Sequence, residues 1–317
     1  MTSPRTSPRT SLPDRAAARP GQRRAGRPVI AALLAAVLLV GAVAPAGTLA
    51  AQGDTAVLVG AGDVGWCGRP WAAQTAKLVA ATPGTVFVPG DVAYPKGTRA
   101  DFSKCYAPTW GKFRSRTRPA PGNHEYYTKD AAPYFSYFGS RAGTKGKGWY
   151  SYDAGTWHVI VLNSNCAAVG GCGPGSAQER WLRADLAAHP VACTLAYFHH
   201  PRFSSGPHGP TAEMDAFWRD LHAAGAEIVV NGHDHDYERF APQTPDGALD
   251  AAAGIREFVV GTGGSPLYPF IRAPRNSEAR ALAHGVLKLT LRPGSYDWAF
   301  IPVAGGTFTD SGSGTCH

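Results

Sequence analysis

The stretch EIVVNGHDH at residues 227–235 joins a short run of β-branched residues to a glycine and two histidines. Such a run, bounded by a turn signal, is typical of a buried strand, and we predict one over residues 227–231. The two imidazoles of His233 and His235 are two positions apart in the extended segment that follows. They can therefore point to the same side of it, which indicates a binding site at the end of this strand.

Four other apolar stretches end in the same way, with carboxylate, amide or imidazole side chains. Ligands collect at the carboxyl ends of strands in open α/β sheets, so we expect these ends to meet. Each segment alone also has an ordinary interpretation as a turn or as a structural histidine. Oxygen and nitrogen donors without a thiolate favour iron, manganese or zinc. The four segments are GDVG at 62–65, GDVAY at 90–94, GNHE at 122–125 and HHP at 199–201.

The order of the predicted elements indicates an α/β protein. Early strands alternate with helices and later strands follow one another, which favours a mixed α/β sandwich over a doubly wound Rossmann sheet. No repeat and no long polar linker interrupts residues 51–317, so we expect one catalytic domain there. Further strands are predicted at 55–60, 85–89, 157–163, 193–198, 256–260, 286–291 and 296–302, and helices at 70–80, 176–188 (with a capping box) and 211–224.

The positive charge of the chain is concentrated at its start. The formal net charge is +8, yet residues 1–28 contain seven arginines against one aspartate. An apolar run and small residues follow, so we predict that residues 1–50 are a signal peptide with a long basic region, cleaved near Ala50 or Ala51. An uncleaved membrane anchor is the alternative. The remainder carries about +2, which gives no indication of nucleic-acid binding.

The cysteines agree with export. All six lie after the predicted cleavage site, and an even number suits disulfides in an oxidising compartment. Six cysteines allow 15 pairings, and the sequence does not choose among them. We favour Cys166–Cys172, which closes a short glycine-rich loop, and Cys67–Cys105, which ties two loops beside the predicted site; Cys193–Cys316 remains.

Together the five segments resemble the motifs of the calcineurin-like metallophosphoesterases. Tyr94 and the continuation YER at 237–239 are similar to the purple acid phosphatase branch, in its small, single-domain, bacterial secreted form. The resemblance covers residues 55–305 and implies two mixed β-sheets packed face to face, flanked by helices in four layers, with a dinuclear metal centre. It implies ligands Asp63, Asp91, Tyr94 and His235 for the first metal, and Asp91, Asn123, His199 and His233 for the second.

The chemistry of these ligands fits such a centre. A carboxylate can bridge two ions about 3.5–4 Å apart. A tyrosine has an unperturbed pKa near 10, so its binding as phenolate favours Fe(III) in the first position, with a divalent Fe, Zn or Mn ion in the second. An Fe(III)–M(II) pair leaves a surplus of about +1 to attract phosphate, after three anionic ligands and a bridging hydroxide.

The implied function is a secreted, metal-dependent phosphoric ester hydrolase of the acid phosphatase type. It hydrolyses phosphate monoesters of small molecules by attack of a metal-bound hydroxide. His124, adjacent to ligand Asn123, is the first candidate for protonating the leaving group. His208 is the second, with a solvated loop histidine as the alternative. We interpret His200 as structural, because neighbouring strand side chains face opposite ways.

Three other functions compete with this one. A phosphodiesterase or nucleotidase on the same scaffold is the main alternative, because metal ligands do not fix the substrate. A protein serine/threonine phosphatase fits less well, since the second motif continues YPKG at 94–97 rather than with an Asp-Arg-Gly segment. A non-catalytic phosphate-binding protein would be expected to have lost ligands, and all seven are present. We expect no membrane contact after cleavage, and the sequence does not indicate the oligomeric state.

Overall fold

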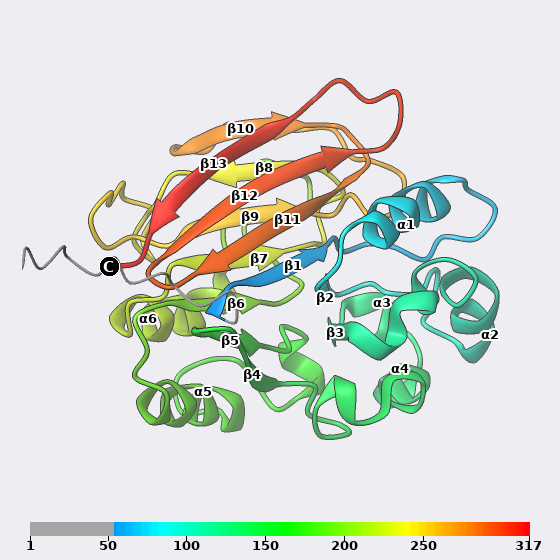
Figure 1. The fold of residues 1–317 in the computed structure, drawn as a ribbon. Helices are drawn as coiled ribbons and strands as arrows, with labels where there is room; N and C mark the ends of the chain where they lie inside the picture. Colours follow the sequence, from blue (N-terminus) through cyan, green and yellow to red (C-terminus); the bar gives the residue numbers. More distant parts are fainter. Residues whose placement is uncertain (1–53) are drawn as a thin grey trace, which may run out of the picture. The chain divides into compact units, whose positions relative to one another are not determined.

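The computed structural model describes residues 54–317, which form two mixed β-sheets packed face to face (Figure 1). In the first sheet β1, β2 and β3 are parallel, and in the second β5, β6, β7 and β9 are parallel, while the remaining neighbours are antiparallel. In spatial order the first sheet contains β13 (Asp310–Thr315), β12 (Ser295–Pro302), β11 (Gly285–Arg292), β1 (Ala56–Gly60), β2 (Thr85–Pro89) and β3 (Thr117–Ala120). The second contains β10 (Ser277–Ala281), β8 (Tyr237–Phe240), β9 (Arg256–Val260), β7 (Ile228–Asn231), β6 (Thr194–Tyr197), β5 (Trp157–Val161) and β4 (Tyr150–Ala154).

In the second sheet, apolar side chains that point alternately to the two faces of a strand explain why both faces are buried. Val159 and Val161 belong to the large apolar cluster between the sheets, whereas Ile160 belongs to a second cluster with the helices α5 (Ala177–Ala188) and α6 (Asp215–Ala223). Successive strand side chains point to opposite faces, so one apolar run serves both clusters.

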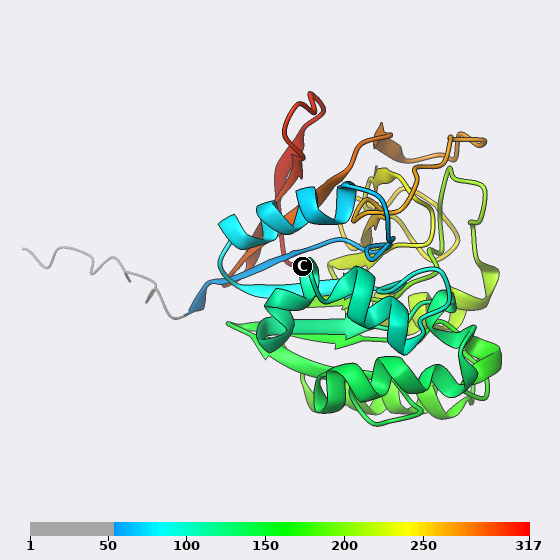
Figure 2. The same ribbon diagram turned by 90° about the vertical axis from the view of Figure 1, so that its right-hand side faces the viewer.

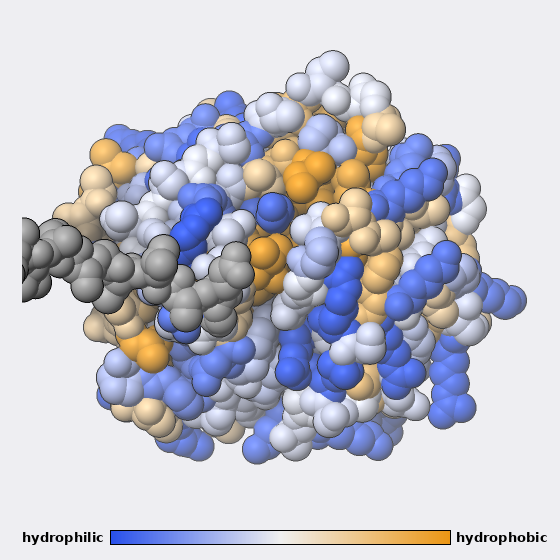
Figure 3. Space-filling view, viewed as in Figure 1, coloured by the Kyte–Doolittle hydropathy of each residue, from blue (hydrophilic) through white to orange (hydrophobic). Residues whose placement is uncertain are grey.

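The first sheet is also flanked by a helix, α1 (Trp71–Ala81), which packs against β11 (Figure 2). The predicted arrangement of two mixed sheets with flanking helices is therefore confirmed. On the face seen in Figure 3, hydrophilic side chains predominate, with smaller hydrophobic groups over the first sheet. The short helices are α2 (Arg99–Asp101), η2 (Phe102–Tyr106), η3 (Trp110–Arg116), α3 (Asn123–Tyr126), η4 (Lys129–Ala131), α4 (Ala132–Phe138), η5 (Gly139–Ala142), η6 (Cys166–Ala168) and η7 (Ala212–Met214).

The predicted elements are present, with one correction at α5. Every predicted strand corresponds to an observed one, and the three predicted helices correspond to α1, α5 and the pair η7–α6. The Ser176 Oγ caps α5 by accepting a hydrogen bond of 3.2 Å from the Glu179 amide. The Glu179 carboxylate, however, accepts from the Gly175 amide at 2.9 Å, so the second half of the predicted capping box reaches one residue further back.

The two favoured disulfides and the pair that remained are all formed. They lie at different places in the fold and join segments separated by 38, 6 and 123 positions. The pairs are Cys67–Cys105, Cys166–Cys172 and Cys193–Cys316.

The predicted signal peptide, residues 1–50, lies outside the described residues, as does its cleavage site. Within residues 54–317, none of the helices combines the length and the apolar character needed to cross a membrane.

Candidate metal centre

The loops that follow the parallel strands are joined to one another by backbone hydrogen bonds. The Asp63 amide, after β1, donates to the Gly90 carbonyl, after β2, at 3.2 Å. In the second sheet, the Gly232 amide, after β7, donates to the His199 carbonyl, after β6, at 3.0 Å. These bonds hold the carboxyl ends of the strands together, which is where the sequence predicted a site.

Three possible ligand atoms surround the phenol oxygen of Tyr94, and the four together form the first position. The Tyr94 hydroxyl lies 2.7 Å from Asp63 Oδ1, 2.9 Å from Asp91 Oδ2 and 3.1 Å from His235 Nε2. A phenol has one hydrogen and can satisfy only one of these atoms. His235 Nδ1 lies 2.7 Å from the Pro266 carbonyl, which can only accept, so Nε2 is left with a lone pair facing the same point.

A second group of possible ligand atoms surrounds His199 Nε2, and we call this group the second position. His199 Nε2 lies 3.0 Å from Asn123 Oδ1, 3.2 Å from His233 Nδ1 and 3.3 Å from Asp91 Oδ2. The other ring nitrogen of His199 lies 2.9 Å from the Pro89 carbonyl and is thereby fixed as a donor. The oxygen Asp91 Oδ2 belongs to both groups, which is the arrangement that a bridging carboxylate requires.

The outward oxygens of the two aspartates are held by backbone amides. Asp63 Oδ2 accepts from the His233 amide, and Asp91 Oδ1 accepts from the His124 amide, each at 2.9 Å. Hydrogen bonds of this kind fix the orientation of carboxylates that bind metals. Each of these two aspartates is thus oriented by a residue of another motif.

Three of the predicted ligands have a left-handed backbone. The φ angles of Asp63, Asp91 and His233 are 61°, 49° and 72°. Non-glycine residues rarely adopt this conformation, and where they do it is often at functional sites. All three lie directly after a glycine in their motifs.

The motif glycines are required by the side chains of other motifs. A Cβ atom built on any of three of them would overlap a predicted ligand, because that ligand fills the space where a side chain would be. The pairs are Gly90 with His199, Gly122 with Asp91, and Gly232 with Asp63.

The charges of this cluster favour a cation. Burial raises the pKa of Tyr94 well above its ordinary value, and Asp63 and Asp91 raise it further, so a phenolate here needs a positive ion. Burial also opposes ionisation of Asp91, but His199 and His124 hold its pKa well below the usual range. Two groups of lone pairs with buried carboxylates therefore fit a pair of metal ions.

His124 lies beside the first position. Its ring is 4.3 Å from that of Tyr94 and 4.7 Å from that of Tyr127, and its Nε2 is 3.7 Å from Asp91 Oδ2. The other ring nitrogen lies 2.6 Å from the Pro95 carbonyl. The half-buried imidazole therefore keeps Nε2 directed at the cluster.

His208 lies on another side of the cluster. Its exposed ring is 5.0 Å from that of His233 and 5.1 Å from that of Tyr268. Its loop is fixed by Asp234, whose carboxylate accepts hydrogen bonds from the amides of His208 and Gly209, both at 2.9 Å. The structure therefore brings all nine predicted site residues together.

Three further residues near the cluster were not predicted as site residues from the sequence. The interpretation of His200 as facing away is wrong, because β6 ends at Tyr197 and strand alternation no longer applies; its ring lies 4.4 Å from that of His233. Tyr268 stacks on His235 at 4.0 Å and comes from an irregular segment without a sequence signal. Glu125 was quoted only as part of its motif.

Glu125 links two motifs below the cluster. It is fully buried, and one of its oxygens accepts from the amides of Val92 at 2.9 Å and Ala93 at 3.1 Å. Its other oxygen accepts from the Gly122 amide at 2.8 Å. Burial, together with Asp91, raises the pKa of Glu125 to about 8. The fourth residue of GNHE thus fixes the loop that carries Asp91.

Comparison with known proteins gives one family and several relatives. Residues 49–237 match the model of the calcineurin-like phosphoesterases. Purple acid phosphatase 15 of Arabidopsis thaliana is 28% identical over 225 residues, covering 59% of this chain and 41% of that protein. An uncharacterized protein of Mycobacterium tuberculosis is 27% identical over 246 residues, covering 62% and 45%. The chain spans less than half the length of these curated relatives.

Solved structures show the same fold. A purple acid phosphatase from yellow lupin seeds superposes with a TM-score of 0.67 at 20% identity, covering 83% of this chain and 54% of that one. GAP50, described as the anchor in the inner membrane complex of Plasmodium, gives a TM-score of 0.62 at 12% identity, covering 83% and 89%. At these identities the likeness concerns the fold, and function depends on the site.

Proposed function

Because the chain belongs to the calcineurin-like phosphoesterase family, we propose that it is a secreted dinuclear-metal phosphatase that hydrolyses phosphate monoesters, of the acid phosphatase type. The observation that carries this proposal is the position of Asp91 Oδ2, which lies 2.9 Å from the Tyr94 hydroxyl and 3.3 Å from His199 Nε2. One oxygen shared by two convergent groups of donors suits two adjacent ions. Three disulfides support export to an oxidising compartment.

We assign Asp63, Asp91, Tyr94 and His235 to the first metal, and Asp91, Asn123, His199 and His233 to the second. The phenol favours Fe(III) in the first position and leaves a divalent Fe, Zn or Mn ion for the second. When bound, the two ions would lower the pKa of a water molecule and neutralise the charge of the phosphoryl group.

The two candidate histidines can divide the remaining work. His124 Nε2, 3.7 Å from Asp91, is placed to give a proton to the departing alcohol. His208, with its exposed ring beside His233, is placed to bind a phosphoryl oxygen from the opposite side. Asp234 keeps His208 there through its backbone amide, bonded at 2.9 Å. While the ester bond breaks, His124 would thus contact the leaving oxygen and His208 a phosphoryl oxygen.

The test is metal analysis of the purified protein, with a visible spectrum and an assay of p-nitrophenyl phosphate. We expect two metals per chain, a charge-transfer band that is lost in Tyr94→Phe, and hydrolysis of the monoester. Active protein with two metals but without iron or a visible band would contradict the assignment of Fe(III). Full hydrolysis by Asp91→Ala would contradict the dinuclear mechanism itself.

A phosphodiesterase or nucleotidase is the second candidate, because the same ligand set serves both reactions. Comparing p-nitrophenyl phosphate with its bis-ester separates the two. A higher kcat/KM for the bis-ester would replace the monoesterase proposal while leaving the metal centre unchanged. A protein that binds two metals and hydrolyses neither ester would instead be a binding protein on this fold.

A further inference from the structure

A cleft of about 440 Å³ opens beside the second position. Asn123 and His200 line its inner end. Asn123 Oδ1 lies 3.0 Å from His199 Nε2, and the His200 ring lies 4.4 Å from that of His233. A phosphate ester held at the metal cluster would therefore have space for the rest of the molecule on this side.

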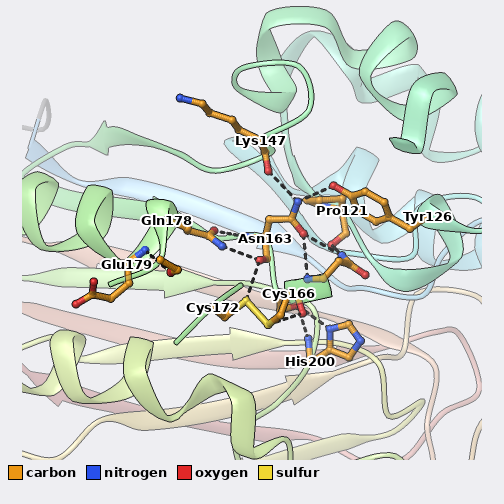
Figure 4. Close-up of a disulfide and its surroundings, with 12 residues drawn as sticks. Pro121, Tyr126, Lys147, Asn163, Cys166, Cys172, Gln178, Glu179 and His200 are labelled. Carbon is orange, nitrogen blue, oxygen red and sulfur yellow. Dashed lines mark hydrogen bonds between the residues drawn. A yellow bond between two sulfur atoms is a disulfide. The ribbon is translucent and has the colours of Figure 1, made fainter. Parts of the chain in front are cut away.

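The walls of the cleft are apolar surfaces from two parts of the chain. One wall is formed by Tyr126 and Tyr127 at the end of α3, and Tyr127 is 60% exposed. The other is formed by Ala167 and Ala168 of η6, whose methyl groups are exposed. This wall is anchored by the disulfide Cys166–Cys172 (Figure 4). The cleft is thus a preformed slot between an aromatic surface and a cross-linked loop.

Several polar groups of the walls are already engaged within the protein (Figure 4). The Tyr126 hydroxyl accepts from Asn163 Nδ2 at 2.7 Å, and Asn165 Nδ2 donates to Asn163 Oδ1 at 3.0 Å. Ser164 Oγ lies 2.8 Å from His200 Nδ1. These groups have little hydrogen-bonding capacity left for a ligand, so an occupant gains mainly from apolar contact.

The charge of the cleft also limits which substrates it can bind. Its one charged lining residue in the described part of the chain is Glu213, an exposed carboxylate of η7, and neither lysine nor arginine lines it. Lys147 is near the disulfide in space, yet its side chain points away from it (Figure 4). A second phosphate on the substrate would meet this carboxylate without a counter-charge, which disfavours polyphosphorylated substrates.

We propose that this cleft binds the leaving group of the phosphate monoester, and that the leaving group is an uncharged aryl or alkyl alcohol. The inference rests on the proposed phosphatase function. Water supplies the oxygen of the new P–O bond and loses one proton, the ester P–O bond breaks, and the departing alcohol takes a proton from His124. The proton lost by the water restores that of His124, so the products are the alcohol and hydrogen phosphate. The His124 ring lies 4.7 Å from that of Tyr127, so the proton donor lies beside the aromatic wall of the cleft.

The experiment compares 1-naphthyl phosphate, methyl phosphate and inorganic pyrophosphate as substrates of the wild-type holoenzyme and of Ala168→Trp. An indole at this exposed position fills the cleft without replacing a buried residue. We expect the variant to lose roughly 10- to 100-fold in kcat/KM for the naphthyl ester, as is typical of a blocked apolar pocket, and less than about 2-fold for the methyl ester. Leu249→Trp, at an exposed residue outside the lining of the cleft, is the matched control and should change neither kcat/KM value.

A second variant tests the charge. Glu213→Lys should raise kcat/KM for pyrophosphate relative to methyl phosphate several-fold, because the cation offsets the second phosphate at the mouth of the cleft. Tyr127→Ala should raise KM for the naphthyl ester more than it lowers kcat. A ratio of naphthyl to methyl ester that is unchanged in Ala168→Trp would overturn the cleft assignment and leave the phosphatase proposal standing.

Binding of the product gives a readout that does not depend on catalysis. 1-Naphthol should bind the wild-type holoenzyme and bind Ala168→Trp at least about 10-fold more weakly, as measured by equilibrium dialysis. Equal binding to both would contradict the cleft assignment. Failure of the wild type to hydrolyse any monoester would overturn the phosphatase proposal, and with it the role of the cleft, even if naphthol binds.

Discussion

Within residues 54–317, two clusters of histidine and aspartate lie at opposite ends of the parallel strands, and they are built differently. At the carboxyl ends, His199 Nε2 faces Asn123 Oδ1, His233 Nδ1 and Asp91 Oδ2, at 3.0 to 3.3 Å. At the amino end of β5, the buried His158 lies between two carboxylates, with Nδ1 3.1 Å from Asp153 and Nε2 2.8 Å from Asp185. Both clusters contain histidine and aspartate, but only in the second does one imidazole have a carboxylate on each ring nitrogen.

The difference teaches that partners, rather than residue types, distinguish a metal site from an ion pair. An imidazolium between two carboxylates has a complementary atom on each side. Burial lowers the pKa of His158, but Asp185 and Asp153 outweigh this effect and raise it. The rings of His158 and His189 stack at 4.1 Å, and both nitrogens of His158 lie within hydrogen-bond distance of a carboxylate oxygen. In the first cluster one imidazole shares a carboxylate oxygen with a phenol, whereas in the second one imidazole has a separate carboxylate on each ring nitrogen.

The largest expected effect follows from removing the oxygen that both metal positions share. Asp91→Asn keeps the shape but lowers the charge, and we expect it to lose metal from both positions and to reduce kcat/KM on the order of 10³-fold. Metal content by mass spectrometry and the monoester assay measure both. Asp185→Asn, in the other cluster, is the control and should keep two metals. Loss of metal in both variants would contradict the distinction between the clusters.

An intermediate effect is expected at Asp234. This residue lies between the predicted ligands His233 and His235 in the sequence, yet its carboxylate is fully hydrogen-bonded within the protein. Its carboxylate is filled by the hydroxyl of Ser204 and the amides of His208 and Gly209. Asp234→Asn should keep both metals and lower kcat about 10-fold by freeing the loop of His208. In a His208→Ala background it should have no further effect.

Additive losses in that double-mutant cycle would contradict a role for Asp234 through His208. A loss of metal in Asp234→Asn would show that it supports the ligands instead.

The smallest expected effect is a pH-dependent change in stability that comes from the cluster of His158, Asp153 and Asp185. The pKa of His158 is raised on folding, so its stabilisation is fully present below its unfolded pKa near 6.5 and is lost as the pH rises through the folded value. The wild type should have a higher Tm than His158→Gln. This difference in Tm should be larger at pH 6 than at pH 9, by roughly 2–4 °C. Thermal unfolding measures this gap, and a gap that widens toward pH 9 would contradict the assignment.

Much of the fold was predictable because its central strands are short runs of β-branched residues. The strands that were missed lack this signal. The edge strand β3 contains Pro119, and β13 reads DSGSGT, which forms a strand because it pairs with β12 rather than through its own composition. Such strands depend on a neighbour that the local sequence does not reveal.

The metal cluster was predictable for a related reason, and its surroundings were not. The ligands follow strands directly, so the strand positions place them. His200 and Tyr268 lie in irregular segments, where the chain direction is set by contacts such as that of the Tyr268 amide with the His235 carbonyl at 3.0 Å. Alternation rules end with the strand, which is why His200 was assigned to the wrong side.

The overlap of each motif glycine with a ligand from another motif has a consequence for inheritance. The His199 side chain occupies the space that a side chain at position 90 would need, and the Asp63 side chain occupies that at position 232. A recombination point between residues 90 and 199 separates both pairs. If it joins this chain to a relative with a bulkier residue at either glycine, that residue overlaps a ligand encoded on the other parental segment. The motifs are therefore constrained to evolve as one unit, although more than a hundred residues separate the first from the last.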